Sequence, residues 1–341
     1  MTSTADTDVA VQQAVATLRR GGLVAFATET VYGLGADAES PEAVARVFAA
    51  KGRPAHHPLI VHIGRAEQLD RWAADAPPSA RRLARRFWPG PLTLVVKRAA
   101  RVPDAVTGGQ DTVGLRVPDH PVALALLTAF GGGIAAPSAN RFGRLSPTTA
   151  AHVRTDLGEA VDYVLDGGSC RVGIESTILD VSGARPRLLR PGAITSAELE
   201  AVLGAPLAGP SGDAPRSPGA LPAHYAPRTP LVLVPLADLQ AEVARRLENN
   251  ECVAVLTRCA ATPAEWPFAG SPAFTRCVWQ VMPADPRGYA RELYARLRGL
   301  DTLRADRILV EAPPPDAPWQ AVRDRLTRAA QAGLDQEASH A

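Results

Sequence analysis

The sequence predicts an α/β protein of two domains. The first is expected to hold a twisted mixed sheet with flanking helices, and the second to be a smaller, parallel, Rossmann-like α/β domain. At 341 residues the chain is longer than one hydrophobic core usually organises. Short apolar segments of strand length alternate with segments of helical periodicity, and a Pro- and Gly-rich stretch interrupts them. We therefore expect a first domain over residues 8–204, a linker over 205–230 and a second domain over 231–332.

Helices of the first domain are predicted from apolar spacing and from the residues that begin and end them. Ser40 can cap a helix that has Pro41 at its first position, and Gly52 is well placed to end it. Other helices are expected at 11–18, 66–74, 79–87 and 121–130, and one beginning at Ser146 and Pro147. Strands are expected at 23–27, 58–63, 92–97, 113–117, 163–165, 177–181 and 187–189, with a short one at Ile134.

The second domain shows the alternation that is typical of a small parallel sheet. Strands are expected at 231–234, 253–256 and 308–310, and helices at 236–247, 288–300 and 319–331. This part lacks a Gly-x-Gly-x-x-Gly motif, so dinucleotide binding is not expected there.

Composition argues against several classes of protein. The net charge of +2 gives no whole-molecule attraction to nucleic acid or membrane. The four cysteines show no Cys-x-x-Cys spacing, so neither a zinc site nor a disulfide framework is expected. The N-terminus lacks the layout of a signal peptide, and glycines and Pro137 break the uncharged run 121–140. We expect a cytoplasmic protein without membrane contact.

Lys51 and Arg53 open a segment that joins a predicted helix to a predicted strand. If this turn is extended, alternate residues project to one side, so the two cations would share a side. A single pair of this kind is ordinarily a solvated turn, but two cations directed at one place fit an anion between them. The chain has only two lysines, Lys51 and Lys97, so a lysine here is less readily explained as background composition.

Polar residues also follow or interrupt the apolar strands of the first domain. They are Thr28–Tyr32, His62, Arg116, Ser138 with Asn140, and Glu175–Thr177. Turns and caps explain most of them singly, but a guanidinium between apolar strand neighbours, as at Arg116, needs an anionic partner. Strand ends are where ligand sites form in α/β sheets. The residues alone predict a site for an anionic, phosphorylated ligand that acts by positioning and charge neutralisation, and they leave the reaction open.

Several motifs in this order closely resemble the YrdC-domain family. They are Thr28-Glu29-Thr30-Val31-Tyr32-Gly33-Leu34, Lys51-Gly52-Arg53-Pro54 with Pro58–His62, Ala136-Pro137-Ser138-Ala139-Asn140 with Ser146-Pro147-Thr148, and Glu175-Ser176-Thr177. The resemblance covers about residues 8–230 motif by motif. The long form of the family, with a linker and a second α/β domain, resembles the whole chain in architecture.

The resemblance implies an L-threonylcarbamoyladenylate synthase activity. Such an enzyme forms threonylcarbamoyl-AMP and pyrophosphate from L-threonine, bicarbonate and ATP, a nucleotidyltransferase reaction. Its product serves the threonylcarbamoyladenosine modification of tRNA next to the anticodon. The resemblance also implies Mg2+ with ATP but no dedicated protein metal site. The product would pass to a downstream tRNA threonylcarbamoyl-transferase machinery, and a weak contact with tRNA is compatible with this role.

Site residues carry over by position. ATP binding is implied for Lys51, Arg53, His57, Thr112, Ser138, Asn140, Ser146, Arg190 and Tyr225. L-Threonine binding is implied for Thr30, His62, Arg116, Ala136 (through its backbone) and Ser176. Lys51 and Arg53 are the implied catalytic residues, and Tyr225 is the implied lid tyrosine in the linker. Residues 220–223 replace the Met-Lys-Tyr-Arg common in the family lid, so the lid carries less charge here.

Three other functions compete at this stage. A non-catalytic RNA-binding module would use the basic helix at Arg81–Arg86 and shift tRNA without turning over ATP. A carbamoyl-transfer enzyme of hydrogenase maturation would need zinc-binding cysteine pairs and an acylphosphatase segment, for which this chain has no room. A regulatory protein would sense nucleotide through the second domain.

Overall fold

The computed structural model describes residues 4–209, 212–258 and 275–338. Cys259, one of the four cysteines, lies outside them. The chain divides by its contacts into two compact units. Unit 1 comprises Met1–Phe142 with Ser146–Ala220, and unit 2 comprises Gly143–Leu145 with Leu221–Ala341. The first part of the expected linker therefore belongs to unit 1 and its second part to unit 2.

Unit 1 is built on one mixed sheet. Its described strands are β1 (Val24–Phe26), β2 (Gly33–Asp37), β3 (Ile60–His62), β4 (Ala73–Asp75), β5 (Leu92–Arg98), β6 (Thr112–Arg116), β7 (Ile134–Ala135), β8 (Tyr163–Leu165), β9 (Thr177–Asp180) and β10 (Arg187–Arg190). They lie in the order β10-β9-β5-β6-β3-β7-β2-β1-β8, with β4 paired to β5. The β3–β6, β5–β9 and β1–β8 pairs are parallel and the others antiparallel, which confirms the mixed sheet.

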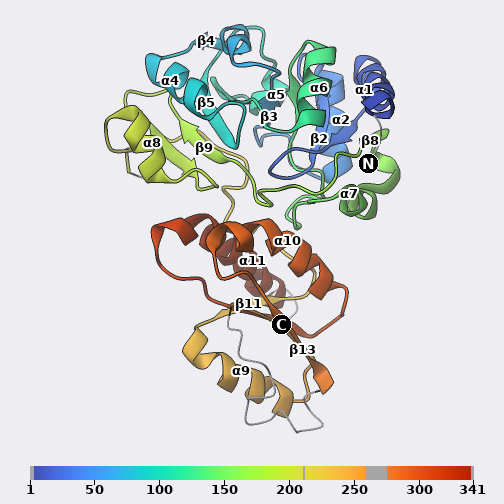
Figure 1. Cartoon of the computed structure of the whole chain (residues 1–341), viewed down its shortest axis with the longest axis vertical. Helices are drawn as coiled ribbons and strands as arrows, with labels where there is room; N and C mark the ends of the chain where they lie inside the picture. Colours follow the sequence, from blue (N-terminus) through green and yellow to red (C-terminus); the bar gives the residue numbers. More distant parts are fainter. Residues whose placement is uncertain (1–3, 210–211, 259–274, 339–341) are drawn as a thin grey trace. The chain divides into compact units, whose positions relative to one another are not determined.

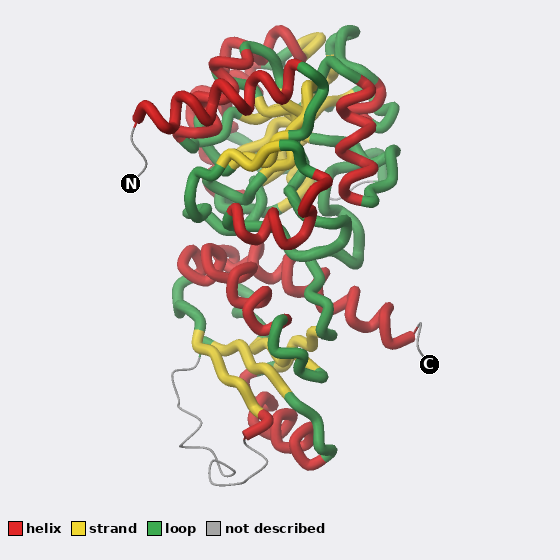
Figure 2. The backbone as a smooth tube through the Cα atoms, turned by 90° about the vertical axis from the view of Figure 1, so that its right-hand side faces the viewer, coloured by secondary structure: helices red, strands yellow, loops and turns green. Residues whose placement is uncertain are grey.

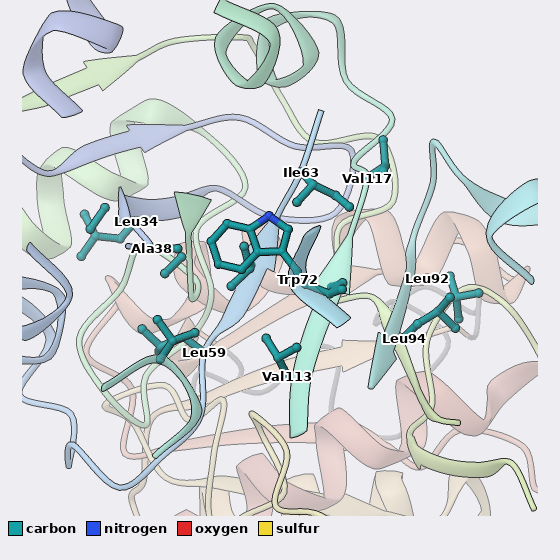
Figure 3. Close-up of a cluster of buried hydrophobic side chains, with 14 of the residues drawn as sticks. Leu34, Ala38, Leu59, Ile63, Trp72, Leu92, Leu94, Val113 and Val117 are labelled. Atoms are coloured by element: carbon teal, nitrogen blue, oxygen red, sulfur yellow. The ribbon is translucent and has the colours of Figure 1, made fainter. Parts of the chain in front are cut away.

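Helices pack on both faces of this sheet. They are α1 (Thr4–Arg19), α2 (Pro41–Lys51), α3 (Leu69–Trp72), α4 (Pro78–Phe87), α5 (Asp104–Thr107), α6 (Pro121–Phe130), α7 (Ala150–Leu157) and α8 (Ser196–Leu203), with 3-10 turns η1 (Ala66–Gln68) and η2 (Gly158–Ala160). On one face α1 and α6 lie side by side and bury Val24, Phe26 and Ile134 (Figure 1). The other face faces the main core, in which Trp72 lies among Leu59, Ile63, Leu94 and Val113 (Figure 3).

The sequence missed two strands of this sheet and misplaced one helix. β2 is rich in glycine because a Cβ at Gly35 would lie 2.9 Å from the ring of Phe26, so the apolar pattern of a strand is absent. β4 continues directly from α3, where a single helix was expected over 66–74. The helix predicted to begin at Ser146 and Pro147 begins at Ala150, because Thr149 is its cap and accepts a hydrogen bond from the His152 N–H. That prediction was wrong.

Unit 2 has a parallel sheet, as expected for a small α/β domain, with four described strands where the sequence predicted three; β13 was missed. Its described elements are β11 (Leu231–Val234), α9 (Leu236–Glu248), β12 (Val253–Thr257), β13 (Cys277–Val281), α10 (Pro286–Asp301), β14 (Arg307–Glu311), η5 (Ala317–Trp319) and α11 (Gln320–Ala338). The strand order is β11-β14-β12-β13, and every described pair is parallel. Figure 2 shows strands flanked by helices in both units, so the predicted fold class is confirmed. Within the described residues, none of the helices has both the length and the apolar character that a membrane span requires.

Candidate active site

One face of the sheet in unit 1 gathers polar side chains from five strands. Strand registers pair Ile60 with Gly114 and His62 with Arg116, and they pair Thr93 with Ile178. Since side chains alternate along a strand, these residues share the face opposite the main core. Beside the apolar residues under α1 and α6, the face holds a small apolar cluster of Ile60, Val95 and Ile178. It also carries the polar side chains of His62, Thr93 and Arg116. Alternation along ordinary strands therefore assembles the site.

Arg116 lies at the centre of this face and is 3% exposed. Its Nη1 donates to Thr30 Oγ1 at 2.9 Å, and its Nε donates to the Gly90 carbonyl at 3.2 Å. Its Nη2 lies 2.7 Å from Glu29 Oε1, in a buried ion pair that lacks the alignment of a hydrogen bond. The anionic partner expected for Arg116 is thus Glu29, a residue to which sequence reasoning gave no role.

His62 lies beside Arg116 across the β3–β6 pair and is neutral. Burial, assisted by the charge of Arg116, lowers the pKa of His62 to about 3. Its ring meets that of Phe26 edge-on at 5.9 Å. A neutral imidazole at this position can donate or accept a hydrogen bond without adding charge to the site.

Ser176 and Arg190 form a second buried group on the same face. The hydroxyls of Ser176 and Thr93 lie 2.8 Å apart, and Arg190 donates to the Ser176 carbonyl at 3.1 Å and to its hydroxyl at 3.2 Å. Arg190 Nη1 also donates to the Pro218 carbonyl at 3.1 Å. Thr93 was missed from the sequence, although a threonine within the apolar run 92–96 was a signal that could have identified it.

Lys51 is the last residue of α2, so the extended Lys-x-Arg turn expected from the sequence is wrong. Gly52 ends the helix with φ 63° and ψ 35°, the left-handed conformation that glycine adopts without strain. Lys51 Nζ donates to the carbonyls of Ser138 and Asn140, each at 2.5 Å. Burial and the nearby charge of Arg53 hold the pKa of Lys51 well below its usual value. The helix end, followed by the glycine, is what brings Lys51 and Arg53 close together.

Arg53 and His57 continue the same segment. Arg53 is 7% exposed, donates to the Pro58 carbonyl at 3.0 Å and lies 5.6 Å from the centre of the Phe142 ring. His57 also contacts this ring edge-on at 5.4 Å. Burial, and then the charge of Arg53, lower the pKa of His57 to about 4, so it is neutral near pH 7. Phe142 thus offers a flat surface to two residues for which the sequence implied nucleotide binding.

Most of the other residues carried over from the sequence are buried and belong to unit 1, while Ser138 is partly exposed. Ser146 donates to Glu175 Oε1 at 2.5 Å, and the Ala136 N–H donates to the Ile60 carbonyl at 2.9 Å. Thr112 begins β6, where it lies with Ile60 and the linker residues Arg216–Pro218 around a small cavity. Gln110 holds this linker segment by accepting from the Arg216 N–H at 2.7 Å and donating to the Arg216 carbonyl at 3.2 Å.

Tyr225 is the exception, because it belongs to unit 2. It has a positive φ of 59° and is buried, with its ring stacked 6.0 Å from that of Tyr294. The guanidinium of Arg325 lies 5.1 Å from the centre of the Tyr225 ring. Its role over a nucleotide stays a prediction.

The site therefore combines buried cations with hydroxyls, neutral imidazoles and backbone groups. Arg116 lies on the sheet face with Thr30, His62 and Ser176, while Lys51 and Arg53 come from the end of α2. Such a set can neutralise anions and orient polar groups away from bulk water, where charge interactions are strong. The described residues bring together no group of three or more His, Cys, Asp or Glu side chains that could hold a metal ion.

Comparisons with known proteins identify relatives over nearly the whole chain. The family described as telomere recombination, Sua5–YciO–YrdC, matches residues 16–192. The family described as the C-terminal domain of threonylcarbamoyl-AMP synthase matches residues 194–331.

Three proteins named threonylcarbamoyl-AMP synthase, each from a different organism, are similar to this chain. The one from Pyrococcus abyssi is 40% identical over 92% of this chain and 91% of its own length. The one from Bacillus subtilis is 41% identical over 95% of this chain and 93% of its own length. The one from Schizosaccharomyces pombe is 36% identical over 90% of this chain and 84% of its own length. The crystal structure of P. abyssi Sua5 complexed with L-threonine matches with a TM-score of 0.86 and 38% identity, covering 96% of this chain and 95% of that one.

Proposed function

Because this chain belongs to the Sua5/YrdC family of threonylcarbamoyl-AMP synthases, we propose that it forms threonylcarbamoyl-AMP and pyrophosphate from L-threonine, bicarbonate and ATP. The observation that carries this conclusion is the match of relatives with this name to both units, over at least nine-tenths of the chain. A relative of the same fold was solved with L-threonine, which supports the amino acid as a ligand. The product would serve the threonylcarbamoyladenosine modification of tRNA.

L-Threonine would bind on the sheet face around Arg116. A guanidinium is a planar donor suited to a carboxylate, and Arg116 is held by Thr30 and the Gly90 carbonyl in a fixed orientation. His62, Ser176 and the backbone of Ala136 would supply the remaining polar contacts. Their burial supports a site that excludes water from the amino acid.

ATP would bind at the end of α2 and along the neighbouring strand ends. Lys51 and Arg53 would neutralise its phosphates, and His57, Thr112, Ser138, Asn140, Ser146 and Arg190 would complete the nucleotide site. Lys51 now donates to the carbonyls of Ser138 and Asn140, so it is fixed beside two of these residues before any nucleotide arrives. A fixed cation needs little reorganisation when charge develops on the phosphates.

Two steps account for the reaction. In the first step the threonine amine, as the neutral base, attacks the carbon of CO2. A nitrogen–carbon bond forms, one C=O π bond opens and a proton leaves the nitrogen, which gives a carbamate. If bicarbonate is attacked, its hydroxide is expelled and leaves with that proton as water. A carbamate oxygen then attacks the α-phosphorus of ATP and displaces pyrophosphate as the α–β bond breaks, which makes the enzyme a nucleotidyltransferase. An anion must approach a polyanion in this second step, and Lys51 and Arg53 would offset the repulsion.

Mg2+ would enter as the complex with ATP. The described residues offer no cluster of carboxylates and imidazoles for it, so the phosphates themselves would carry the ion. The reaction would take place in the cytoplasm, and the labile product would pass to the machinery that transfers the threonylcarbamoyl group to tRNA.

The linker over residues 205–230 would act as a lid on the site. Its segment Arg216–Pro218 already lies on the sheet face of unit 1, bound by Gln110 and Arg190. Arg190 is also an expected nucleotide contact, so the linker and the nucleotide would share a partner. A cover of this kind would keep water from the reactive adenylate.

One assay tests the proposal. The purified chain is incubated with ATP, L-threonine, bicarbonate and Mg2+, and each component is omitted in turn. We expect pyrophosphate release that needs all four, together with threonylcarbamoyl-AMP in the mass spectrum. ATP turnover without threonine, or a tRNA shift without any ATP turnover, would contradict the proposal.

A further inference from the structure

Arg116 and Glu29 bury one donor and two acceptors that form no hydrogen bond. Both carboxylate oxygens of Glu29 and the Nη2 of Arg116 lack a hydrogen-bond partner among the described residues. The side chains of Glu29 and Arg116 are only 1% and 4% exposed. Their 2.7 Å contact is an attraction of charges that leaves the hydrogen-bonding capacity of both groups unused. Since buried polar groups are almost always hydrogen-bonded, such a cluster indicates a ligand that completes it.

The unused groups are complementary to a zwitterion. A carboxylate only accepts hydrogen bonds and an ammonium only donates them. In an α-amino acid the nitrogen lies roughly 2.5 Å from the carboxyl carbon, so the protein groups that bind the two ends must be neighbours. Glu29 and Arg116 are such neighbours.

Other buried carboxylates of unit 1 are engaged elsewhere. Glu175 accepts from the Ser146 hydroxyl at 2.5 Å, and Asp180 accepts from the Ser182 hydroxyl at 2.6 Å. Within the described residues, Arg116 forms its ion pair with Glu29 and with neither of these.

We infer that Glu29 binds the α-ammonium of L-threonine and is a specificity-determining residue that selects amino acids over the corresponding hydroxy acids. This inference rests on the proposed function. Threonine would place its carboxylate on Arg116 and its ammonium on Glu29, so that two positive and two negative groups balance. A site with Arg116 and no Glu29 would favour ligands that carry only the negative charge.

Hydrogen bonds fix the backbone of the loop that carries Glu29, so this residue can discriminate between amino acids and hydroxy acids. Thr28 Oγ1 accepts from the N–H groups of Thr30 and Val31, each at 3.2 Å, and donates to the Val31 carbonyl at 2.6 Å. The Glu29 carbonyl accepts from the Val172 N–H at 2.7 Å. Glu29 is therefore fixed on both sides, which lowers the entropy that ligand binding must overcome.

The titratable groups that neighbour Glu29 or Arg116 leave Arg116 as the cationic neighbour of Glu29 near pH 7. His62 is neutral, with its pKa lowered to about 3 by burial and by Arg116. Burial also lowers the pKa of His120, against the opposing effect of Glu29. Cys170 stays protonated, because burial raises its pKa to about 12. A ligand ammonium would thus be the second cation that this carboxylate meets.

The test compares two ligands of the same shape. Dissociation constants are measured by calorimetry at pH 7 for L-threonine and for 2,3-dihydroxybutyrate of matching configuration, in which a hydroxyl replaces the ammonium. The proteins are the wild-type chain, Glu29→Gln and Arg116→Gln, with Glu39→Gln as the control. Glu39 is a partly exposed carboxylate that pairs with Arg71 and Arg101.

We expect Glu29→Gln to raise the dissociation constant of L-threonine about tenfold or more, because a charge-assisted hydrogen bond to the ammonium is lost. The affinity for the hydroxy acid should be unchanged or improved. Arg116→Gln should lower the affinity for both ligands, and Glu39→Gln should change the affinity for neither. Equal weakening of both ligands in Glu29→Gln would show that Glu29 only positions Arg116, and would overturn the inference. No binding of L-threonine by the wild-type chain would instead reject the proposed function.

A variant that keeps the charge covers the case in which Glu29→Gln does not fold. Glu29→Asp retains the carboxylate but withdraws it by one methylene. We expect its preference for L-threonine over the hydroxy acid to fall while the absolute affinity for the hydroxy acid stays near that of the wild type. An unchanged preference in this variant would also overturn the inference.

Discussion

Replacing Lys51 by methionine should abolish most of the synthesis while leaving the chain folded. Methionine keeps much of the volume of the lysine stem and removes the charge and both hydrogen bonds. Those bonds, to the carbonyls of Ser138 and Asn140, are 2.5 Å long and buried. A typical hydrogen bond contributes about 1 kcal/mol, and the lowered pKa of Lys51 means that burial of its charge costs stability, so the net loss should be about 2 kcal/mol or less. A domain of this size should then unfold at most about 8 °C lower.

Loss of the charge should cost activity beyond this loss of stability. Removing one preorganised electrostatic group from an active site typically lowers kcat by about 100-fold or more. The assay is pyrophosphate release with saturating ATP, L-threonine and bicarbonate, well below the unfolding temperature of the variant. Lys97→Met is a matched control, because Lys97 is the other lysine of the chain and forms an exposed ion pair with Asp111. Wild-type turnover in Lys51→Met, or an equal loss in Lys97→Met, would remove Lys51 from the mechanism.

Three further predictions follow from the geometry. Arg116→Gln should raise the KM for L-threonine at least about tenfold and leave the KM for ATP nearly unchanged, as measured by initial rates; an effect confined to ATP would contradict the assignment. A chain that ends at Gly204 lacks the whole linker and should keep a folded first domain, seen in its circular dichroism, but synthesise threonylcarbamoyl-AMP poorly. Full activity would refute the role of the lid. Acid should destabilise the chain through His62, whose pKa is about 3 in the folded state and about 6.5 in the unfolded state. Between these values the unfolded state binds a proton that the folded state does not bind. The free energy of unfolding should therefore fall by up to about 4 kcal/mol as the pH drops from about 6.5 to 3. Urea titrations of His62→Gln across this range should show a flatter dependence on pH, and parallel curves for variant and wild type would contradict the assignment.

Much of the fold was predictable because local signals agreed with the tertiary structure. Ser40, Pro41 and Gly52 marked both ends of α2, and the predicted helix over 121–130 is α6. His62 and Arg116 were expected to interrupt or follow apolar strands, and both lie on the sheet face opposite the main core. What failed depended on long-range packing. β2 is a strand because its glycines fit against Phe26, and Ser146 does not cap a helix because it bonds to Glu175 instead.

The sequence indicated the cationic part of the site better than its anionic part. Arg116 was identified because its guanidinium interrupts an apolar strand, and the need for an anion was clear. That this anion is Glu29 could not be predicted, because the loop after β1 contacts β6 only through the tertiary fold. The pairing of Lys51 with Arg53 was expected for the wrong reason, since a helix end and not an extended turn brings them together.

A crystal structure of this chain with L-threonine and a non-hydrolysable ATP analogue would test the central claim most directly, because that claim is that buried cations on one face of the first sheet let two anions meet. We predict that the threonine carboxylate lies within hydrogen-bond distance of Arg116, and that the phosphates lie against Lys51 and Arg53, with the amine directed towards the α-phosphorus. Ligands bound away from this sheet face, or Lys51, Arg53 and Arg116 turned away from both of them, would contradict the account.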